Sequence, residues 1–188
     1  MFKFEDVKLV QLPDQVLRKK SQNVELPLSQ ENIDLIEKMI YHVDDSQKPK
    51  TKFRPAVGVA AVQYGILKNI FYIMIKDQDG QDGKYLFKDA LVNPVMLGHS
   101  EHKIAISEGE GCLSVKENHP HQEGFIYRYS RVIIKAYSYN EKKEKIYDVS
   151  GYLAIVMQHE FDHLQGTLFI DHINQKDPWY NDKDAKFI

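Results

Sequence analysis

The sequence predicts an α+β fold in which antiparallel β-sheets surround one central helix. Two features favour this class. Several apolar runs of strand length are joined by polar turns, and a strongly apolar segment at residues 150–166 then has the length and end signals of a helix. A chain of 188 residues suits one domain with a sizeable core, so we expect residues 1–188 to form a single domain.

The first predicted helix covers residues 29–44. Ser29 is a suitable N-cap, and apolar side chains then recur at the spacing of one helix face, at Ile33, Ile36, Met39, Ile40 and Val43. The segment 44–55 that follows is polar and contains two prolines. We therefore expect an exposed connection that borders a cleft.

Small side chains dominate the segment 56–63, which reads Ala-Val-Gly-Val-Ala-Ala-Val-Gln. A glycine in a strand marks either tight packing or a close approach of the backbone to another group, such as a ligand. Both readings fit this segment. Packing does not account for the amide of Gln63 at its end.

Four further strands are predicted before the second helix. Residues 70–75 form a continuous apolar run, the turn at 77–83 is rich in Asp-Gly pairs, and residues 91–97 form the next strand, with Pro94 at an edge or bulge. Side chains in residues 131–139 alternate as expected for the two faces of a strand, and we expect this strand to pair with residues 145–149 across a polar turn. After the second helix we expect a short strand at 168–170 and a tail that folds back on the domain as a short strand or extended segment.

The helix at residues 150–166 begins at an N-cap candidate, Ser150, and ends at Gly166. Its Tyr152, Val156, His159 and His163 follow one another at intervals of four, three and four residues, which places them on one face of the helix. Two imidazoles four residues apart can bind one metal ion, and the adjacent Glu160 can accept a proton from attacking water. The pattern predicts a hydrolytic metal centre.

The third metal ligand is not found within this helix or after it. Phe169 stands where an extended zinc-protease pattern has its third histidine, and no glutamate follows Glu160. Cys112 is a candidate, because two nearby glycines allow an irregular backbone that delivers a thiolate to a metal. His119 and His121 are second choices in a polar loop.

Composition excludes other classes of function. A net charge of −2, from 25 basic and 27 acidic residues, gives no electrostatic reason to expect direct nucleic-acid binding or attraction to an anionic membrane. The first residues do not form an apolar signal segment, and no apolar run approaches about 18 residues. The single cysteine fits a reducing compartment, so we expect a cytoplasmic protein that does not bind membranes.

Three segments together resemble the signature motifs of the peptide deformylase family in order and spacing: Gly58-Val59-Ala60-Ala61-Val62-Gln63, Glu110-Gly111-Cys112-Leu113-Ser114 and Gln158-His159-Glu160-Phe161-Asp162-His163. The long connection before the first motif is similar to the larger class of that family. Two positions depart from it. Ala56 replaces the glycine that usually opens the first motif, where its β-carbon would crowd a substrate backbone, and Val62 replaces proline or threonine.

The resemblance implies a metal site and a set of catalytic groups. Cys112, His159 and His163 would bind one divalent metal ion, with iron(II) as the usual native ion and zinc, nickel or cobalt able to replace it. Glu160 would act as general base and general acid. The Gln63 amide and the Leu113 N–H would receive the oxyanion.

The resemblance also implies the substrate, which is the N-formylmethionyl end of a newly made polypeptide. Val57, Tyr152 and Val156 are the expected walls of a methionine pocket, and Gly58 would pair with the substrate backbone. By the same resemblance, Glu110 should form an ion pair with Arg128. We expect a monomer that associates transiently with the ribosome.

Two other functions fit the motif helix. A metalloprotease would use a third ligand other than a thiol and would cleave internal peptide bonds. A metal-binding protein without catalysis would explain Ala56 as a sign of a decayed site. The presence of both Glu160 and Gln63 argues against decay, because neither is needed merely to hold metal.

Overall fold

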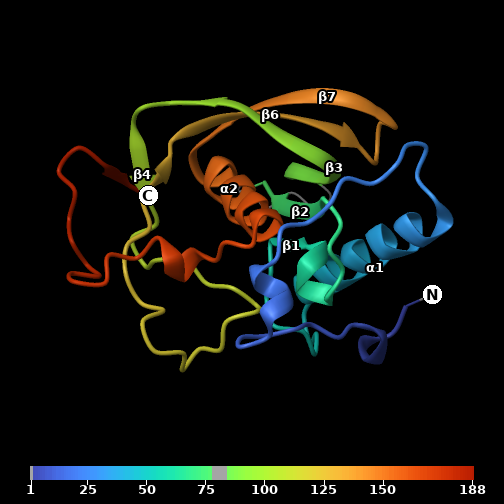
Figure 1. Ribbon diagram of the computed structural model, residues 1–188, viewed down its shortest axis with the longest axis horizontal. Coiled ribbons are helices and arrows are strands. Elements are labelled where there is room, and N and C mark those ends of the chain that lie inside the picture. The colour runs from blue at the N-terminus through green and yellow to red at the C-terminus, as the bar shows by residue number, and fades with distance from the viewer. Residues whose placement is uncertain (1, 78–83) are drawn as a thin grey trace.

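The computed structural model describes residues 2–77 and 84–188. The helices and strands follow one another as α1 (Gln30–Ser46), β1 (Gly58–Ala60), β2 (Ile70–Lys76), β3 (Tyr85–His99), β4 (Lys103–Ala105), β5 (Arg128–Tyr129), β6 (Arg131–Ser138), β7 (Lys143–Ser150), α2 (Gly151–Gln165) and β8 (Lys186–Phe187) (Figure 1). Four 3₁₀ turns complete this part of the chain: η1 (Phe4–Asp6), η2 (Gln15–Arg18), η3 (Ala61–Tyr64) and η4 (Phe169–Asp171).

The strands form two sheets, and the predicted α+β class is confirmed. The larger sheet has the order β1-β2-β3-β6-β7 with antiparallel neighbours throughout. The smaller sheet has the order β5-β4-β8, in which β4 and β8 run parallel. The tail therefore returns to the domain as a short strand, as the sequence predicts.

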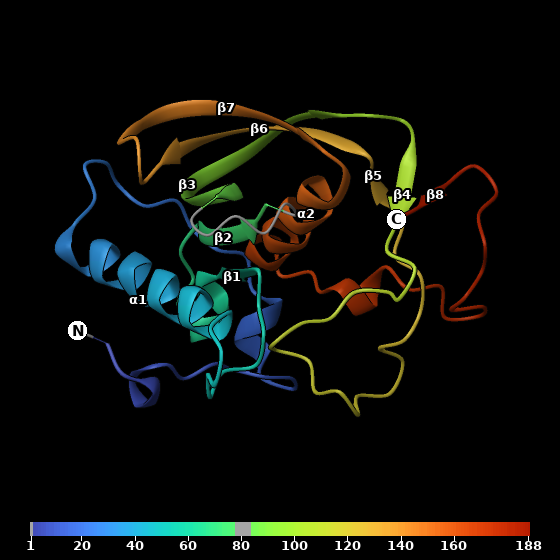
Figure 2. The ribbon, with the colours of Figure 1, turned by 180° about the vertical axis from the view of Figure 1, so that it is seen from behind.

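Helix α2 lies in the hollow of the larger sheet, while α1 covers the opposite face of β1 and β2 (Figures 1 and 2). Strand β2 contacts both helices. The side chains on one face, Phe71, Ile73 and Ile75, belong to the cluster around α2. Those on the other face, Ile70, Tyr72 and Met74, belong to the cluster around α1. Because both faces of β2 are buried, its sequence is a continuous apolar run and does not alternate.

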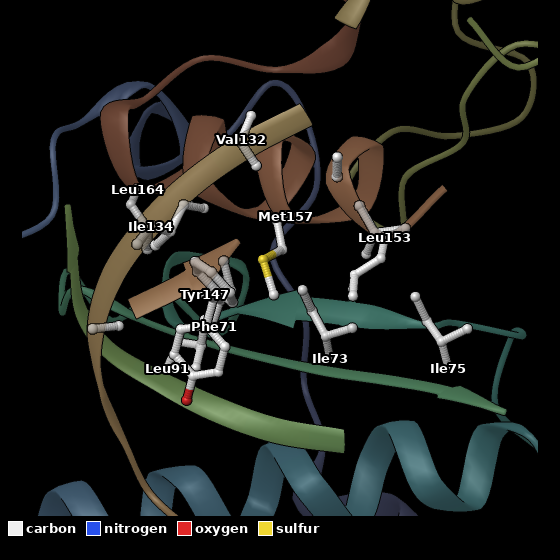
Figure 3. Packing of buried hydrophobic residues seen from close by; sticks show 14 of the residues in the cluster. Phe71, Ile73, Ile75, Leu91, Val132, Ile134, Tyr147, Leu153, Met157 and Leu164 are labelled. Carbon is white, nitrogen blue, oxygen red and sulfur yellow. The ribbon is translucent and has the colours of Figure 1, made fainter. Parts of the chain in front are cut away.

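The core around α2 is built from the inner face of the sheet and the apolar side of the helix. Figure 3 shows Leu153 and Met157 of α2 facing Ile73 and Ile75 of β2, with Leu164 near Ile134 of β6. Four of them are fully buried: Met157, Leu164, Ile73 and Ile134. The helix that carries the histidine motif is therefore fixed along its length by close packing.

Two predicted hairpins are found in the sheet. Strand β2 pairs with β3, and β6 pairs with β7, although the turn predicted at 77–83 lies almost wholly outside the described residues. The pairing of β3 with β6 shifts register between Val92 and Val95. Pro94 lies in this irregular stretch, as expected for a residue that has no N–H to donate to a ladder.

The ends of the two helices agree only partly with the sequence signals. The Ser29 hydroxyl accepts a hydrogen bond from the Asn32 N–H at 3.3 Å, and α1 extends two residues past the predicted end, to Ser46. Gly166 adopts a left-handed conformation and ends α2, as predicted. Ser150 occupies the N-cap position of α2, but its side chain makes no capping hydrogen bond, because Ser150 is also the last residue of β7.

The strand predicted at residues 168–170 is wrong. The chain forms the 3₁₀ turn η4 at Phe169–Asp171, where the Asp171 carboxylate accepts a hydrogen bond from the Leu168 N–H at 2.8 Å. Phe169 and Ile170 are nevertheless buried, so the apolar run reflects core packing and not strand pairing. Over residues 2–77 and 84–188, no helix combines the length and the apolar character needed to cross a bilayer.

Candidate metal centre

Helix α2 carries two histidines toward one point. His159 and His163 are one helical turn apart, and their ring centroids are separated by 5.0 Å. His163 is 1% exposed. Phe169, at the position where an extended protease motif has a histidine, lies face to face with the His159 ring at a centroid distance of 6.1 Å. It contributes apolar packing to the site instead of a ligand atom.

Cys112 reaches the same point from the long loop between β4 and β5. Its sulfur lies 3.3 Å from Nε2 of His163, and the ligand atoms of Cys112, His159 and His163 all lie within 4.8 Å of one another. Burial raises the pKa of the thiol, but the neighbouring His163 and His159 outweigh burial and hold it well below the usual value. The cysteine is thus placed and polarised to act as a thiolate.

A carboxylate behind His159 fixes the orientation of its ring. Nδ1 of His159 donates to Oε2 of Glu110 at 2.8 Å, which leaves Nε2 for the point shared with Cys112 and His163. Burial raises the pKa of Glu110, but hydrogen bonds from Arg128 and His159 overcome this effect and lower the pKa to about 2. Glu110 is therefore an anion over the whole physiological range of pH.

The predicted ion pair between Glu110 and Arg128 is confirmed. Nε and Nη2 of Arg128 donate to the two carboxylate oxygens at 2.7 and 2.9 Å, and both side chains are 4% exposed. Nη1 of Arg128 also donates to Asp162 at 2.5 Å, and Asp162 accepts a further hydrogen bond from His172 at 2.8 Å. A network of charged groups thus connects His159 with the protein surface.

These residues fit a divalent metal ion. One thiolate and two imidazoles make a donor set suited to iron(II), zinc, nickel or cobalt, and three protein ligands leave a position open for water or substrate. The carboxylate that orients His159 is the kind of second contact that metal-binding histidines make. The alternatives predicted for the third ligand, His119 and His121, do not belong to this group of metal-binding atoms.

Glu160 lies beside the three ligands with its carboxylate buried. The side chain is 4% exposed, and within the described ranges Oε2 has no hydrogen-bond partner. Burial is the main cause that raises the pKa of Glu160, to about 7. A carboxyl group with this pKa can accept a proton and return it near neutral pH.

The Gln63 amide faces the cysteine. Its oxygen accepts a hydrogen bond from the Ala60 N–H at 2.9 Å, so its nitrogen is directed away from that strand. Nε2 then lies 3.2 Å from Oγ of Ser114 and 3.5 Å from the sulfur of Cys112. These contacts hold an N–H donor beside the proposed metal position, which explains the amide that packing alone left unexplained.

A cleft of about 600 Å³ opens onto these groups. Its lining includes Gln63, Cys112, Leu113, His159 and Glu160, and also all four residues predicted to contact substrate: Val57, Gly58, Tyr152 and Val156. Val156 is 6% exposed and lies deep, whereas Tyr152 is 40% exposed. The first motif departs from the family at two positions, and these lie in different places. Ala56 lines the cleft, whereas Val62 is fully buried in the core.

Several contributors to the site were not assigned a role from the sequence. Ser114 supports the Gln63 amide, and Asp162 completes the charge network behind the histidines. The sequence indicated them only by position, because Ser114 lies in the second motif and Asp162 in the third. Gln47 and Arg54 line the cleft from the connection after α1, which agrees with the expectation that this connection borders a cleft.

Comparisons of the sequence and of the structure with known proteins all find the same family. The family model described as polypeptide deformylase matches residues 7–179. A peptide deformylase of Mycoplasmopsis pulmonis is 55% identical, over 95% of this chain and 94% of that protein. The crystal structure of peptide deformylase from Ehrlichia chaffeensis matches with a TM-score of 0.74 and 29% identity, over 92% of this chain and 90% of that one. A Met-Ala-Ser-bound peptide deformylase from Acinetobacter baumannii matches with a TM-score of 0.71 and 25% identity, over 89% and 98% of the two chains.

Proposed function

The chain belongs to the polypeptide deformylase family, and we propose that Cys112, His159 and His163 hold the metal ion with which it acts. The enzyme removes the N-formyl group from the amino terminus of newly synthesised polypeptides and releases formate. One observation carries the assignment of residues: three ligand atoms from two distant segments converge within 4.8 Å, next to the buried Glu160 carboxylate.

The proposed chemistry is hydrolysis of a formamide. The metal would act as a Lewis acid and would lower the pKa of a water molecule. Glu160 accepts a proton as the water oxygen attacks the formyl carbon, and then gives that proton to the departing nitrogen as the carbon–nitrogen bond breaks. The products are formate and a free amino terminus.

Negative charge develops on the formyl oxygen during this attack. We assign its stabilisation to the Gln63 amide and the Leu113 N–H, because both line the cleft beside Cys112. A donor of this type typically contributes about 3–4 kcal/mol to the transition state. Gln63 is held from two sides, at its oxygen by Ala60 and at its nitrogen by Ser114, so the donor is ordered before substrate arrives.

The cleft also supports a choice of substrate. Val57, Tyr152 and Val156 provide apolar walls for a methionine side chain, and β1 stands at the end of the larger sheet, where an extended peptide can add as a further strand beside Gly58. The relative from Acinetobacter baumannii is described with Met-Ala-Ser bound, which is the deformylated form of such a peptide. We therefore propose formyl-Met peptides as substrates of this chain.

We propose iron(II) as the native ion, with zinc, nickel or cobalt able to replace it, because the thiolate and imidazole donors accept all of these ions. We further propose a cytoplasmic monomer that meets its substrate during transient association with the ribosome. The single cysteine, which is buried and cannot form an internal disulfide, supports the cytoplasmic location.

The decisive experiment measures formate release from formyl-Met-Ala under anaerobic conditions, together with bound metal. We expect release by the iron(II) form and by protein reconstituted with nickel or cobalt, and no release by Cys112→Ala, which should also lose the ion. Acetyl-Met-Ala-Ser serves as the control for cleavage of internal peptide bonds. Hydrolysis of that peptide, or metal binding that survives Cys112→Ala, would contradict the proposal.

A further inference from the structure

Residues 10–12 connect the two loops that carry the proposed oxyanion donors. The Val10 N–H donates to the carbonyl of Gln63 at 2.8 Å, and the Leu12 N–H donates to the carbonyl of Ser114 at 2.9 Å. Between them, Nε2 of Gln11 donates to the carbonyl of Leu113 at 3.2 Å. Three consecutive residues thus give one hydrogen bond each to segments about 50 and 100 residues away in the sequence.

The Leu113 N–H is available to a ligand. The carbonyl of Cys112, in the same peptide plane, accepts a hydrogen bond from the Val115 N–H at 3.2 Å, and the Leu113 N–H of a trans peptide points the other way. In the part of the chain that the structure describes, this N–H donates to no other group. Leu113 also lines the cleft, where a substrate would meet the N–H.

The direction of this N–H depends on how the turn at Cys112–Val115 is held. The turn fixes one carbonyl of its own, that of Cys112. Among the described residues, the next two carbonyls, of Leu113 and Ser114, accept hydrogen bonds only from Gln11 and Leu12. The peptide group of the Leu113 carbonyl has one further contact, from the Ser114 N–H to the Cys112 sulfur at 3.4 Å. Leu12 additionally packs against the apolar cluster that contains Cys112, so the segment is anchored where it makes these contacts.

We infer that Gln11 is a positioning residue for the oxyanion site and acts through the peptide groups of Leu113. This inference rests on the proposed function, in which the Leu113 N–H receives the developing charge. Preorganised donors contribute to catalysis only if they keep their position to within about 0.5 Å and their direction to within about 10–20°. Gln11 makes the one contact of the three that uses a side chain, so it can be tested without altering a backbone group.

A positioning role and a structural role predict different kinetics. An oxyanion donor binds the transition state more strongly than the planar formyl group, so its misplacement lowers kcat and leaves KM nearly unchanged. Complete loss of such a donor costs about 10²–10³-fold in kcat, and a tilted donor should cost less, about 5–20-fold. Loss of a merely structural hydrogen bond would lower the unfolding midpoint but would not change kcat in the folded enzyme.

The experiment compares Gln11→Leu, Gln11→Glu and Gln11→Lys in the metal-loaded enzyme. Gln11→Leu and Gln11→Glu both lack a donor, and we expect each to lower kcat for formyl-Met-Ala by about 5–20-fold, with KM within about twofold and metal content unchanged. Gln11→Lys restores a donor at the end of a chain of similar reach and should recover most of kcat. Gln15→Leu, exposed in the neighbouring turn η2, is the matched control and should behave as wild type.

Two outcomes would overturn the inference while leaving the proposed function intact. The first is a Gln11→Leu enzyme with the kcat of Gln15→Leu, and the second is a loss of kcat that follows metal content or that Gln11→Lys does not recover. Unfolding midpoints of all variants identify any that fail to fold. A wild-type enzyme that releases no formate would contradict the proposed function itself, and the inference with it.

Discussion

The backbone of Gly58 lies directly against the carboxylate of Glu160. A β-carbon built on Gly58 would stand 2.5 Å from Oε1 of Glu160 and 3.0 Å from its carboxyl carbon, which is closer than real contacts of this type. A side chain at position 58 would therefore have to displace the Glu160 carboxylate. The close approach that the sequence suggested for this strand involves the proposed general base, in addition to any substrate backbone that pairs there.

We predict that Gly58→Ala lowers kcat at least 10-fold because the added methyl group displaces Glu160, while the metal ligands stay in place. Formate release and metal content measure the two effects separately. Gly98→Ala is the matched control, since a β-carbon there would meet no atom within 4 Å. In a Glu160→Ala background Gly58→Ala should cost far less stability than in wild type, and equal costs in both backgrounds would refute the steric explanation.

Removal of the carboxylate itself gives the second prediction. We expect Glu160→Ala to lose about 10²–10⁴-fold in turnover but to retain its metal, because the proposed role of Glu160 is proton transfer and not coordination. Metal analysis of the purified variant, alongside its rate of formate release, distinguishes the two roles. Loss of the ion together with activity would show that Glu160 is a ligand.

The third prediction concerns the charge network behind His159. Arg128→Leu would leave Glu110 and Asp162 without their shared cation, and Glu110 is only 4% exposed. We expect the free energy of unfolding to fall by about 3–5 kcal/mol, and metal affinity to fall about 10–100-fold because His159 loses a fixed partner. Urea denaturation and competition with a chelator measure these quantities.

The matched control for this prediction is Arg131→Leu. Arg131 also forms a two-point contact with a carboxylate, that of Asp148, but both side chains are about half exposed. Water and salt screen such a pair, so its loss should leave stability and metal affinity close to wild type. Similar losses for the two arginine variants would show that burial is not the reason for the effect.

The sequence predicted His159, His163 and Glu160 as candidates because their spacing on one helix already implies proximity. It left the third ligand open among Cys112, His119 and His121, since all three lie in the connection between β4 and β5 and no local pattern shows which part of it reaches the helix. In the tertiary structure Cys112 lies beside His159 and His163, and the two other histidines do not belong to this group. The roles we assign to these residues remain proposals that the variants above test.

Where sequence and structure differ, tertiary context decides. Ser150 has the chemistry of an N-cap, but pairing of β7 with β6 continues through Ser150 and places it in a strand. The apolar run at residues 168–170 forms a turn, which Asp171 supports by binding the Leu168 N–H, and its side chains are buried in the apolar cluster that contains Cys112. No pattern in the sequence indicates a role for Gln11, because its partner Leu113 lies 102 residues away.

The fourth prediction is a dependence of stability on pH that originates at His42. Burial lowers the pKa of this imidazole to about 4, and its Nδ1 is hydrogen-bonded to the Tyr64 hydroxyl at 2.8 Å. The unfolded chain, with a pKa near 6.5, therefore binds more protons than the folded chain between about pH 4 and 6.5. The contribution of His42 to stability must therefore fall as pH decreases through this window, by about 2 kcal/mol between pH 7 and 5.

Comparison of wild type with His42→Gln isolates this contribution. Glutamine does not titrate and can still bond to the Tyr64 hydroxyl, so all other titrating groups contribute equally to both proteins. Urea denaturation at pH 5, 6 and 7 should show the variant losing about 2 kcal/mol less than wild type between pH 7 and 5. Parallel pH profiles for the two proteins would refute the assignment to His42.

The last prediction concerns the tail after Ile173, which we expect to stabilise the domain more than it serves any contact with the ribosome. Phe125 packs edge-on against both Trp179 and Phe187, at centroid distances of 4.9 and 4.6 Å, and β8 pairs with β4. These two aromatic pairs contribute about 1–3 kcal/mol beyond the area that they bury. Residues 174–188 contain three lysines and three aspartates and thus offer no basic face for RNA.

We therefore expect deletion of residues 174–188 to lower the free energy of unfolding by at least about 1–3 kcal/mol while cosedimentation with ribosomes stays at the wild-type level. Phe187→Ala should reproduce part of the stability loss, because it removes one of the two aromatic partners of Phe125 while leaving the charges of the tail intact. Lys183→Ala, an exposed position in the same segment, should change neither quantity. A truncated protein that stays folded but no longer sediments with ribosomes would instead identify the tail as a docking element.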